Sequence, residues 1–167
     1  MDKTYIGIDN GISGTIGVLY SNGDTKFVTT PVKKEQNYTK TKGNVSRILA
    51  PELYTFICDI KAKSSKNLFC FIERPMVNPT RFKATTSALR ALEATLIIVE
   101  LLDIPYAYID SKEWQKVLLP SGCKGDALKT ASKDIGCRLF PQHKELIEKH
   151  KDADGILIAE YAKRRNF

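Results

Sequence analysis

The sequence predicts an α/β fold in which three antiparallel strands are followed by alternating helices and strands. Two observations carry this prediction. Near the N-terminal end, short apolar runs are separated by glycine-bearing turns, which is typical of hairpins. Further along, apolar runs alternate with segments whose apolar residues recur at helical spacing. The 167 residues are enough for one ordinary hydrophobic core, so we expect a single domain over residues 1–167.

The first three strands are predicted by local signals. The run Tyr5–Ile8 ends in a carboxylate, Asp9, and a turn rich in glycine connects it to a second run, Ile16–Tyr20. The dipeptide Asn22–Gly23 is a strong hairpin signal and predicts a third strand over Lys26–Thr30. An acid at the end of a core strand is costly to bury unless a metal ion or hydrogen bonds compensate its charge. The alternative is an aspartate that caps its own turn.

The middle of the chain predicts a loop, a helix and a central strand. The segment Val32–Gly43 is polar and contains four lysines, so we expect a mobile surface loop. Pro51 suits the first turn of a helix, and apolar residues at helical spacing as far as Ile60 give it one buried face. The apolar run Leu68–Ile72 predicts a strand buried on both faces, and it ends in a second acid, Glu73.

A long helix is predicted over Ala84–Leu102, with Leu89, Leu92 and Leu96 facing inward. Its second half is apolar nearly all round, which is typical of a helix buried on more than one side. Either a second helix layer or another subunit would cover it, and we favour a dimer contact. Beyond it we expect a strand over Ile104–Ile109, a helix that begins at Asp110, and a further helix over 127–136 capped by Asp126.

The chain has an excess of cations, with a formal net charge of +7 and a sequence pI of about 9.2. This excess favours a polyanionic partner such as nucleic acid, although a basic protein without such a partner has the same composition. The candidates for DNA contacts lie in two clusters, in which phosphate contacts and base stacking are available. They are Arg74, Arg81, Phe82, Lys83, Lys112, Lys116 and Lys124. The alternatives are solvated lysines and, for Phe82, a buried core side chain.

Four acids are the candidate catalytic and metal-binding residues. Asp9 and Glu73 close two core strands, whereas Asp152 and Asp154 open the last helix, where simple capping is the alternative. Carboxylates from separate elements are what two-metal phosphodiester hydrolysis requires, because they must hold two divalent ions about 4 Å apart. Oxygen ligands suit Mg²⁺. The sequence therefore predicts a Mg²⁺-dependent nuclease if these elements converge.

Three segments resemble the acidic motifs of RuvC-like Holliday-junction resolvases, in the ribonuclease H-like superfamily. They read GIDNGISGTIGVL, FIERP and DADGILIAEYAKRR. ERPMVNPTRFKATTSALRALEA and WQKVLLPSGCKGDALKTAS resemble the phage and prophage resolvases more closely, so the similarity covers nearly the whole chain. The resemblance implies a mixed five-stranded sheet flanked by helices, a homodimer, Mg²⁺ or Mn²⁺, and paired symmetric nicks across a four-way DNA junction. A phage-encoded enzyme of this kind would act in the cytoplasm of a bacterial host.

Carried over residue by residue, the resemblance implies three metal-binding acids: Asp9, Glu73 and Asp154. The chain departs from the family at Lys151, where many members have an Asp or a His. In an ideal helix, Asp152 would point about 200° away from Asp154, two residues later. It can therefore bind the same metal ions as Asp154 only if it precedes the first regular turn. We expect that it does; otherwise three acids, with His150 near the water, must suffice. Met76 stands where some bacterial relatives have an aromatic wedge, and Phe82 is a candidate for that role.

Three alternatives remain at this stage. Sugar kinases and actin-like ATPases open with a similar hairpin but need two such domains, for which 167 residues are too few, so we expect no nucleotide cofactor. The second alternative is a non-catalytic DNA-binding protein on the same fold, and the third is an endonuclease that cleaves branched DNA more broadly. The cysteines lack zinc-ligand spacing, which favours reduced thiols in the cytosol. We expect no signal peptide and no membrane span, because the longest apolar run, Leu96–Leu102, is interrupted by an acid.

Overall fold

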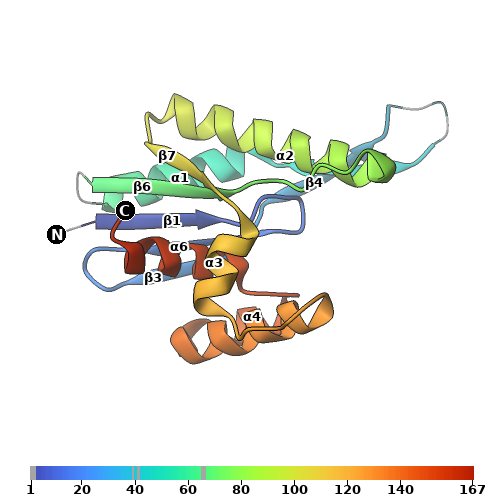
Figure 1. Ribbon diagram of the computed structural model, residues 1–167. Helices are drawn as coiled ribbons and strands as arrows, with labels where there is room; N and C mark the ends of the chain where they lie inside the picture. Colours follow the sequence, from blue (N-terminus) through green and yellow to red (C-terminus); the bar gives the residue numbers. More distant parts are fainter. Residues whose placement is uncertain (1–2, 39, 41, 65–66) are drawn as a thin grey trace.

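The computed structural model describes residues 3–38, 40, 42–64 and 67–167, and a mixed sheet of five strands forms its centre (Figure 1). The strand order is β3-β2-β1-β6-β7, and β4 pairs with β5 in a separate two-stranded ribbon. β1, β2 and β3 are antiparallel neighbours, whereas β6 runs parallel to β1 and to β7. The fold class predicted from the sequence is therefore confirmed. The strands are β1 (Lys3–Ile8), β2 (Thr15–Leu19), β3 (Thr25–Thr29), β4 (Val32–Gln36), β5 (Asn44–Ile48), β6 (Asn67–Glu73) and β7 (Tyr106–Ile109).

Helices cover both faces of the sheet. Figure 1 shows α1 and α2 above the sheet, and α3, α4 and α6 below it. The short helix α5 packs against α4. No helix among the described residues has the length and apolar character needed to cross a membrane. The helices are α1 (Ala50–Lys63), α2 (Phe82–Leu101), α3 (Ser111–Leu118), α4 (Asp126–Leu139), α5 (Lys144–Lys149) and α6 (Asp154–Arg165).

Alternation along the strands divides the buried side chains into two cores. In β1, Tyr5 packs into the core beneath α6, whereas Ile6 and Ile8 pack into the core beneath α1 and α2. Successive side chains of a strand point to opposite faces, so a central strand covered on both sides is apolar throughout. This explains why β1 and β6 appear in the sequence as unbroken apolar runs.

We predicted a loop over Val32–Gly43. That prediction is wrong for the first part of the segment, because β4 begins at residue 32 and pairs antiparallel with β5. Positions 39 and 41 of that segment lie outside the described residues. The strand signal is hidden because the ribbon is highly charged. Glu35 of β4 forms ion pairs with Lys33 on its own strand, at 2.5 Å, and with Arg47 on β5, at 3.2 Å. Cross-strand pairing, rather than an apolar face, specifies these strands.

Helix α2 is rotated relative to the prediction. Its buried side chains are Ala91, Thr95, Ile98 and Val99. Leu92 and Leu96 are half-buried, but Leu89 is exposed, so its predicted inward position is wrong. The buried side of the helix packs against α1 and β5, and its first two buried residues, Ala91 and Thr95, are small. Ile97 is exposed and Leu101 is 74% exposed, so the described part of the chain covers only one side of the helix.

The start of α4 also differs from the prediction. Asp126 lies inside the first turn of the helix, and Gly125 occupies the N-cap position with a φ of 55°. The positive φ suits glycine, which has no Cβ to clash. Asp110, by contrast, begins α3 as predicted, because its carboxylate forms a capping box with Glu113.

Candidate metal centre

Two of the predicted acids lie at the same edge of the sheet. β1 and β6 are parallel neighbours in which Ile8 pairs with Ile72, so Asp9 and Glu73 follow at equivalent positions. The carboxyl ends of parallel strands meet at one edge, which is where open α/β sheets place their ligands. The prediction that both acids share this edge is confirmed.

Close contact between α6 and the sheet brings the last helix to the same edge. A Cβ on Gly7 would lie 2.3 Å from the Gly155 carbonyl oxygen, and a Cβ on Gly17 would lie 2.2 Å from Ile156 Cα. The Gly155 amide donates a hydrogen bond of 2.9 Å to Thr15 Oγ1. Only glycine permits this approach, since real Cβ atoms are not found so close to backbone atoms. The first turn of α6 is therefore fixed beside the ends of β1 and β2.

Three carboxylates converge as a result. Asp9, Asp152 and Asp154 can each offer one oxygen such that these oxygens all lie within 4.8 Å of one another. Asp152 precedes α6, whose N-cap is Ala153, as expected. Its side chain is therefore not turned away from Asp154, as it would be inside a regular helix. Glu73 lies outside this close group but lines the same cleft.

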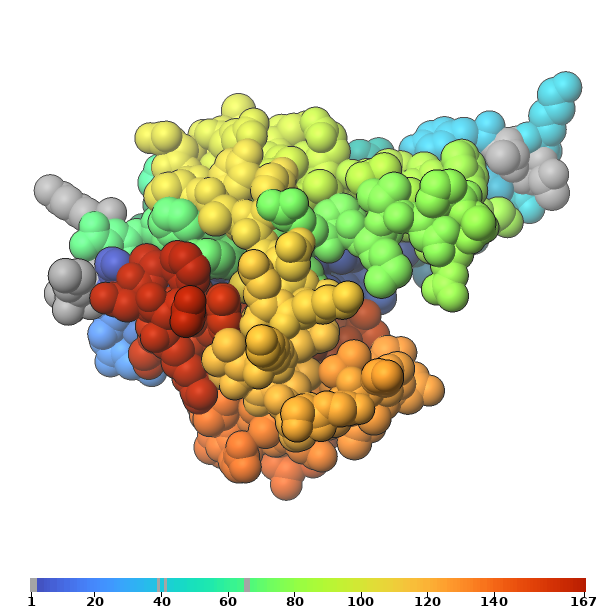
Figure 2. All heavy atoms as spheres, viewed as in Figure 1, coloured from blue at the N-terminus to red at the C-terminus, as the bar shows by residue number. Residues whose placement is uncertain are grey.

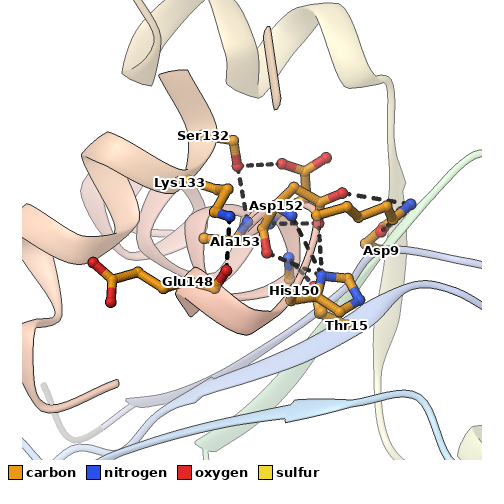
Figure 3. A network of polar contacts seen from close by, with 11 residues as sticks. Asp9, Thr15, Ser132, Lys133, Glu148, His150, Asp152 and Ala153 are labelled. Atoms are coloured by element: carbon orange, nitrogen blue, oxygen red, sulfur yellow. Dashed lines mark hydrogen bonds and ion pairs between the residues drawn. The ribbon is translucent and has the colours of Figure 1, made fainter. Parts of the chain in front are cut away.

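A serine fixes the orientation of the acid in α6 (Figure 3). The Ser132 hydroxyl on α4 donates a hydrogen bond of 2.5 Å to Asp154 Oδ1 and accepts one of 3.0 Å from the Ala153 amide. Both contacts join residues more than 20 positions apart in the sequence. Sequence reasoning missed Ser132, because no local pattern marks a serine whose partner is so distant.

The two residues before Asp152 also reach the cluster. Lys151 Nζ lies 3.4 Å from Asp152 Oδ2 and 4.0 Å from Asp9 Oδ2. His150 Nδ1 lies 3.6 Å from Asp152 Oδ1 and 3.1 Å from the Asp152 backbone oxygen. Lys151 therefore partly neutralises a group of acids that would otherwise repel one another.

Burial and mutual repulsion raise the pKa values of the acids. Burial is the largest cause for Asp9, followed by the charges of Asp154, Glu73 and Asp152, and together they hold its pKa well above the usual range. The same two effects raise the pKa of Glu73 to about 7 and that of Asp154 to about 6. Three neighbouring acids are thus costly to ionise in the protein alone.

The acids fit a hard divalent cation. Asp9 Oδ2 is buried and has no hydrogen-bond partner among the described residues. Such an atom is costly in the folded state unless a cation or a water compensates it. All the donors are carboxylate oxygens, which are the ligands that Mg²⁺ and Mn²⁺ take in proteins.

Comparison with known proteins supports the fold. No protein-family model matches the chain, and no curated protein sequence matches it. Among solved structures, it is similar to Thermus thermophilus RuvC in complex with a Holliday junction substrate, with 13% identity and a TM-score of 0.53 over 98% of this chain and 96% of that chain. The protein has the ribonuclease H-like fold of RuvC. A second structure of Thermus thermophilus RuvC is 14% identical, with a TM-score of 0.46 and the same coverage.

In this RuvC fold, a cleft of about 440 Å³ opens over the acids. Figure 2 shows a hollow between the green segment that leads into α2 and the orange segment that contains the start of α4. Of the predicted DNA-contacting residues, Arg74 and Arg81 line the cleft, together with Lys129 and Met76. The Arg74 guanidinium also lies 3.5 Å from Asp110 Oδ1.

The remaining predicted DNA contacts lie outside the lining of the cleft. Phe82 is 74% exposed, so the alternative of a buried core side chain is wrong. The four lysines among these residues are all exposed: Lys83, Lys112, Lys116 and Lys124.

Sequence reasoning assigned no role at the site to the buried tryptophan beside Glu73. Trp114 of α3 is fully buried, and its indole N–H lowers the pKa of the nearby Glu73 carboxyl, against the larger effect of burial. That N–H makes no hydrogen bond of normal geometry within the described part of the chain.

Proposed function

We propose that this protein is a single-domain endonuclease that resolves four-way DNA junctions by paired symmetric nicks, using two Mg²⁺ ions per active site, with Mn²⁺ as a substitute. The observation that carries the proposal is the convergence of Asp9, Asp152 and Asp154, whose ligand oxygens lie within 4.8 Å of one another. The RuvC fold supports it, because one RuvC structure was solved with a Holliday junction substrate. The Holliday junction is the substrate in the RuvC complex, and a four-way junction is therefore the first DNA to test with this protein.

Each acid has a distinct role in this proposal. Asp9, at the end of β1, and Asp154, in the first turn of α6, would hold the cations together with Asp152. Glu73 would bind from the end of β6. Divalent ions bound there would supply water activation and charge stabilisation at the leaving oxygen. The chain itself orients the carboxylates through Ser132 and the glycine contacts of α6.

Basic and aromatic groups around the cleft would position the DNA. Arg74 and Arg81 can contact phosphates beside the acids, and the exposed ring of Phe82 can stack on an unpaired base at the junction centre. The lysines at 83, 112, 116 and 124 would contact the arms. The net charge of +7 then predicts that junction affinity falls steeply as salt increases.

Paired nicks require two active sites related by the two-fold symmetry of the junction, which a homodimer supplies. The uncovered side of α2, with Leu89, Ile97 and Leu101 exposed, is the surface we propose for the contact. An apolar helix face of this kind is costly to leave in water. Sedimentation that gives a monomer at micromolar concentration would remove the account of paired nicks.

The experiment that tests the function compares three DNA substrates. A synthetic four-way junction, a Y-fork and a linear duplex are incubated with the protein in Mg²⁺ and in EDTA. We expect cleavage of the four-way junction in Mg²⁺ only, and none by Asp9→Asn, which should still bind the junction. Equal cleavage of the Y-fork would assign a broader branched-DNA endonuclease. Binding without cleavage in Mg²⁺ or Mn²⁺ would assign a non-catalytic DNA-binding protein.

A further inference from the structure

Lys151 introduces a positive charge into the group of acids, where a metal ion is proposed to bind. We propose that Lys151 is a tethered counter-cation: it holds a cation position in the metal-free protein, and it moves to a phosphate of the DNA when divalent ions bind. The inference rests on the proposed function and adds a residue that the metal chemistry alone does not require.

The first step is the position of the ammonium group. Lys151 Nζ contacts acids from two different elements, at 3.4 Å from Asp152 Oδ2 and 4.0 Å from Asp9 Oδ2. Asp9 Oδ2 makes no hydrogen bond among the described residues, so the ion pair with Lys151 is the contact that compensates its charge. A metal ion shared by these two carboxylates must therefore compete with the ammonium for the same oxygens.

The second step is the difference in mobility between the partners. The Asp152 side chain is 3% exposed and the Lys151 side chain 42% exposed. The carboxylate is thus fixed by its surroundings, whereas the ammonium is at the end of a flexible four-carbon chain that reaches solvent. The lysine can leave without any unfolding, and the acids stay in place to receive the metal.

The third step is where the displaced ammonium goes. Lys151 lines the same cleft as Arg74 and Arg81, the cations proposed to contact the DNA backbone. Lysine binds phosphate as a point charge, so a shift of its flexible chain is enough to exchange a carboxylate for a phosphate oxygen. In this exchange no charge is left unpaired, because the divalent ions replace the ammonium at the acids.

The proposal predicts opposite effects on metal binding and on DNA. In a variant without the Lys151 ammonium, divalent ions do not have to displace it from the acids, so the DNA-free variant binds them more tightly than the wild type does. A tenfold gain in affinity corresponds to about 1.4 kcal/mol. Without the same ammonium, one phosphate contact is lost, so junction binding and cleavage are weakened.

The test compares Lys151→Met with Lys149→Met by calorimetric titration of Mn²⁺ into the DNA-free protein. Lys149 is the matched control, because it is exposed and pairs with Glu145 on α5, away from the acids. We expect Lys151→Met to bind Mn²⁺ about tenfold more tightly than the wild type, and Lys149→Met to be unchanged. Lys151→Arg, which keeps the charge, should stay near the wild-type affinity. Circular dichroism would confirm that each variant is folded.

Two results would overturn the proposal. One is an Mn²⁺ affinity in Lys151→Met equal to or weaker than that of the wild type. The other is junction affinity and cleavage by Lys151→Met equal to those of Lys149→Met, since the phosphate contact would then be absent. Failure of the proposed function has a different signature: the wild type would bind Mn²⁺ yet cleave no branched DNA, while the variants could still differ in Mn²⁺ affinity.

Discussion

Replacing Glu73 by Gln should stabilise the metal-free protein above neutral pH. Burial and the neighbouring acids raise the pKa of this carboxyl from its ordinary 4.5 to about 7. Between those values the folded state holds a proton that the unfolded state has released. Stability therefore falls as pH rises through this window, and the whole loss is present above pH 7. Glutamine remains neutral and removes the loss.

The size of the effect follows from the pKa difference. Each pKa unit corresponds to about 1.36 kcal/mol, so Glu73→Gln should gain up to about 3 kcal/mol at pH 8 and nearly nothing at pH 4.5. For a chain of this length, 1 kcal/mol shifts the melting temperature by about 2–4 °C. We therefore expect a gain of up to about 6–12 °C at pH 8 in EDTA. In Mg²⁺ the difference should shrink or reverse, because only the native carboxylates bind the metal.

The assay is thermal unfolding followed by circular dichroism at pH 4.5 and pH 8, in EDTA and in Mg²⁺. The matched control is Glu93→Gln, because Glu93 is an exposed glutamate on α2, outside the lining of the acid cleft. A Glu73→Gln variant that is less stable than the wild type at pH 8 in EDTA would refute the reasoning. So would a difference that is the same at both pH values.

Two further predictions test the structure around the site, and a third tests the proposed dimer contact. Gly17→Ala should destabilise the protein by about 1–3 kcal/mol or more in urea unfolding, since its Cβ would lie 2.2 Å from Ile156 Cα; unchanged stability would show that α6 is not in such close contact. Ser132→Ala should cost about 1–3 kcal/mol and weaken Mn²⁺ binding, because it leaves the buried Ala153 amide without its partner and Asp154 without its donor; a variant with wild-type Mn²⁺ affinity would contradict this orienting role. Leu101→Glu should yield a monomer in sedimentation and abolish paired nicks while single nicks persist; a dimer of wild-type stability would place the contact elsewhere.

The sheet and its acids could be predicted because the signals are local. Asn22–Gly23 fixes a hairpin, and two unbroken apolar runs each end in one acid, Asp9 and Glu73. Parallel pairing of those runs places the acids together. The position of Asp152 before α6 was a hypothesis, made because a regular helix would turn its side chain away from the ions expected at Asp154, and it is confirmed.

The features that were missed or wrong depend on tertiary contacts. The β4–β5 ribbon has no apolar pattern, and a tertiary contact reaches the segment between its strands, where the Tyr38 hydroxyl accepts a hydrogen bond of 3.0 Å from Arg90 of α2. Leu89 was placed inward because leucine is the stronger hydrophobic signal, yet close packing placed Ala91 and Thr95 at the contact. Ser132 is found only once α4 and α6 are packed together.

The central claim is that Asp9, Asp152 and Asp154 jointly bind hard divalent cations. Anomalous diffraction from crystals soaked in Mn²⁺ tests it most directly. We expect a peak at about 2.0–2.2 Å from oxygens of at least two of these three acids, with Lys151 Nζ displaced from them. Peaks confined to other sites in crystals of a protein that cleaves junctions with Mn²⁺ would contradict the claim.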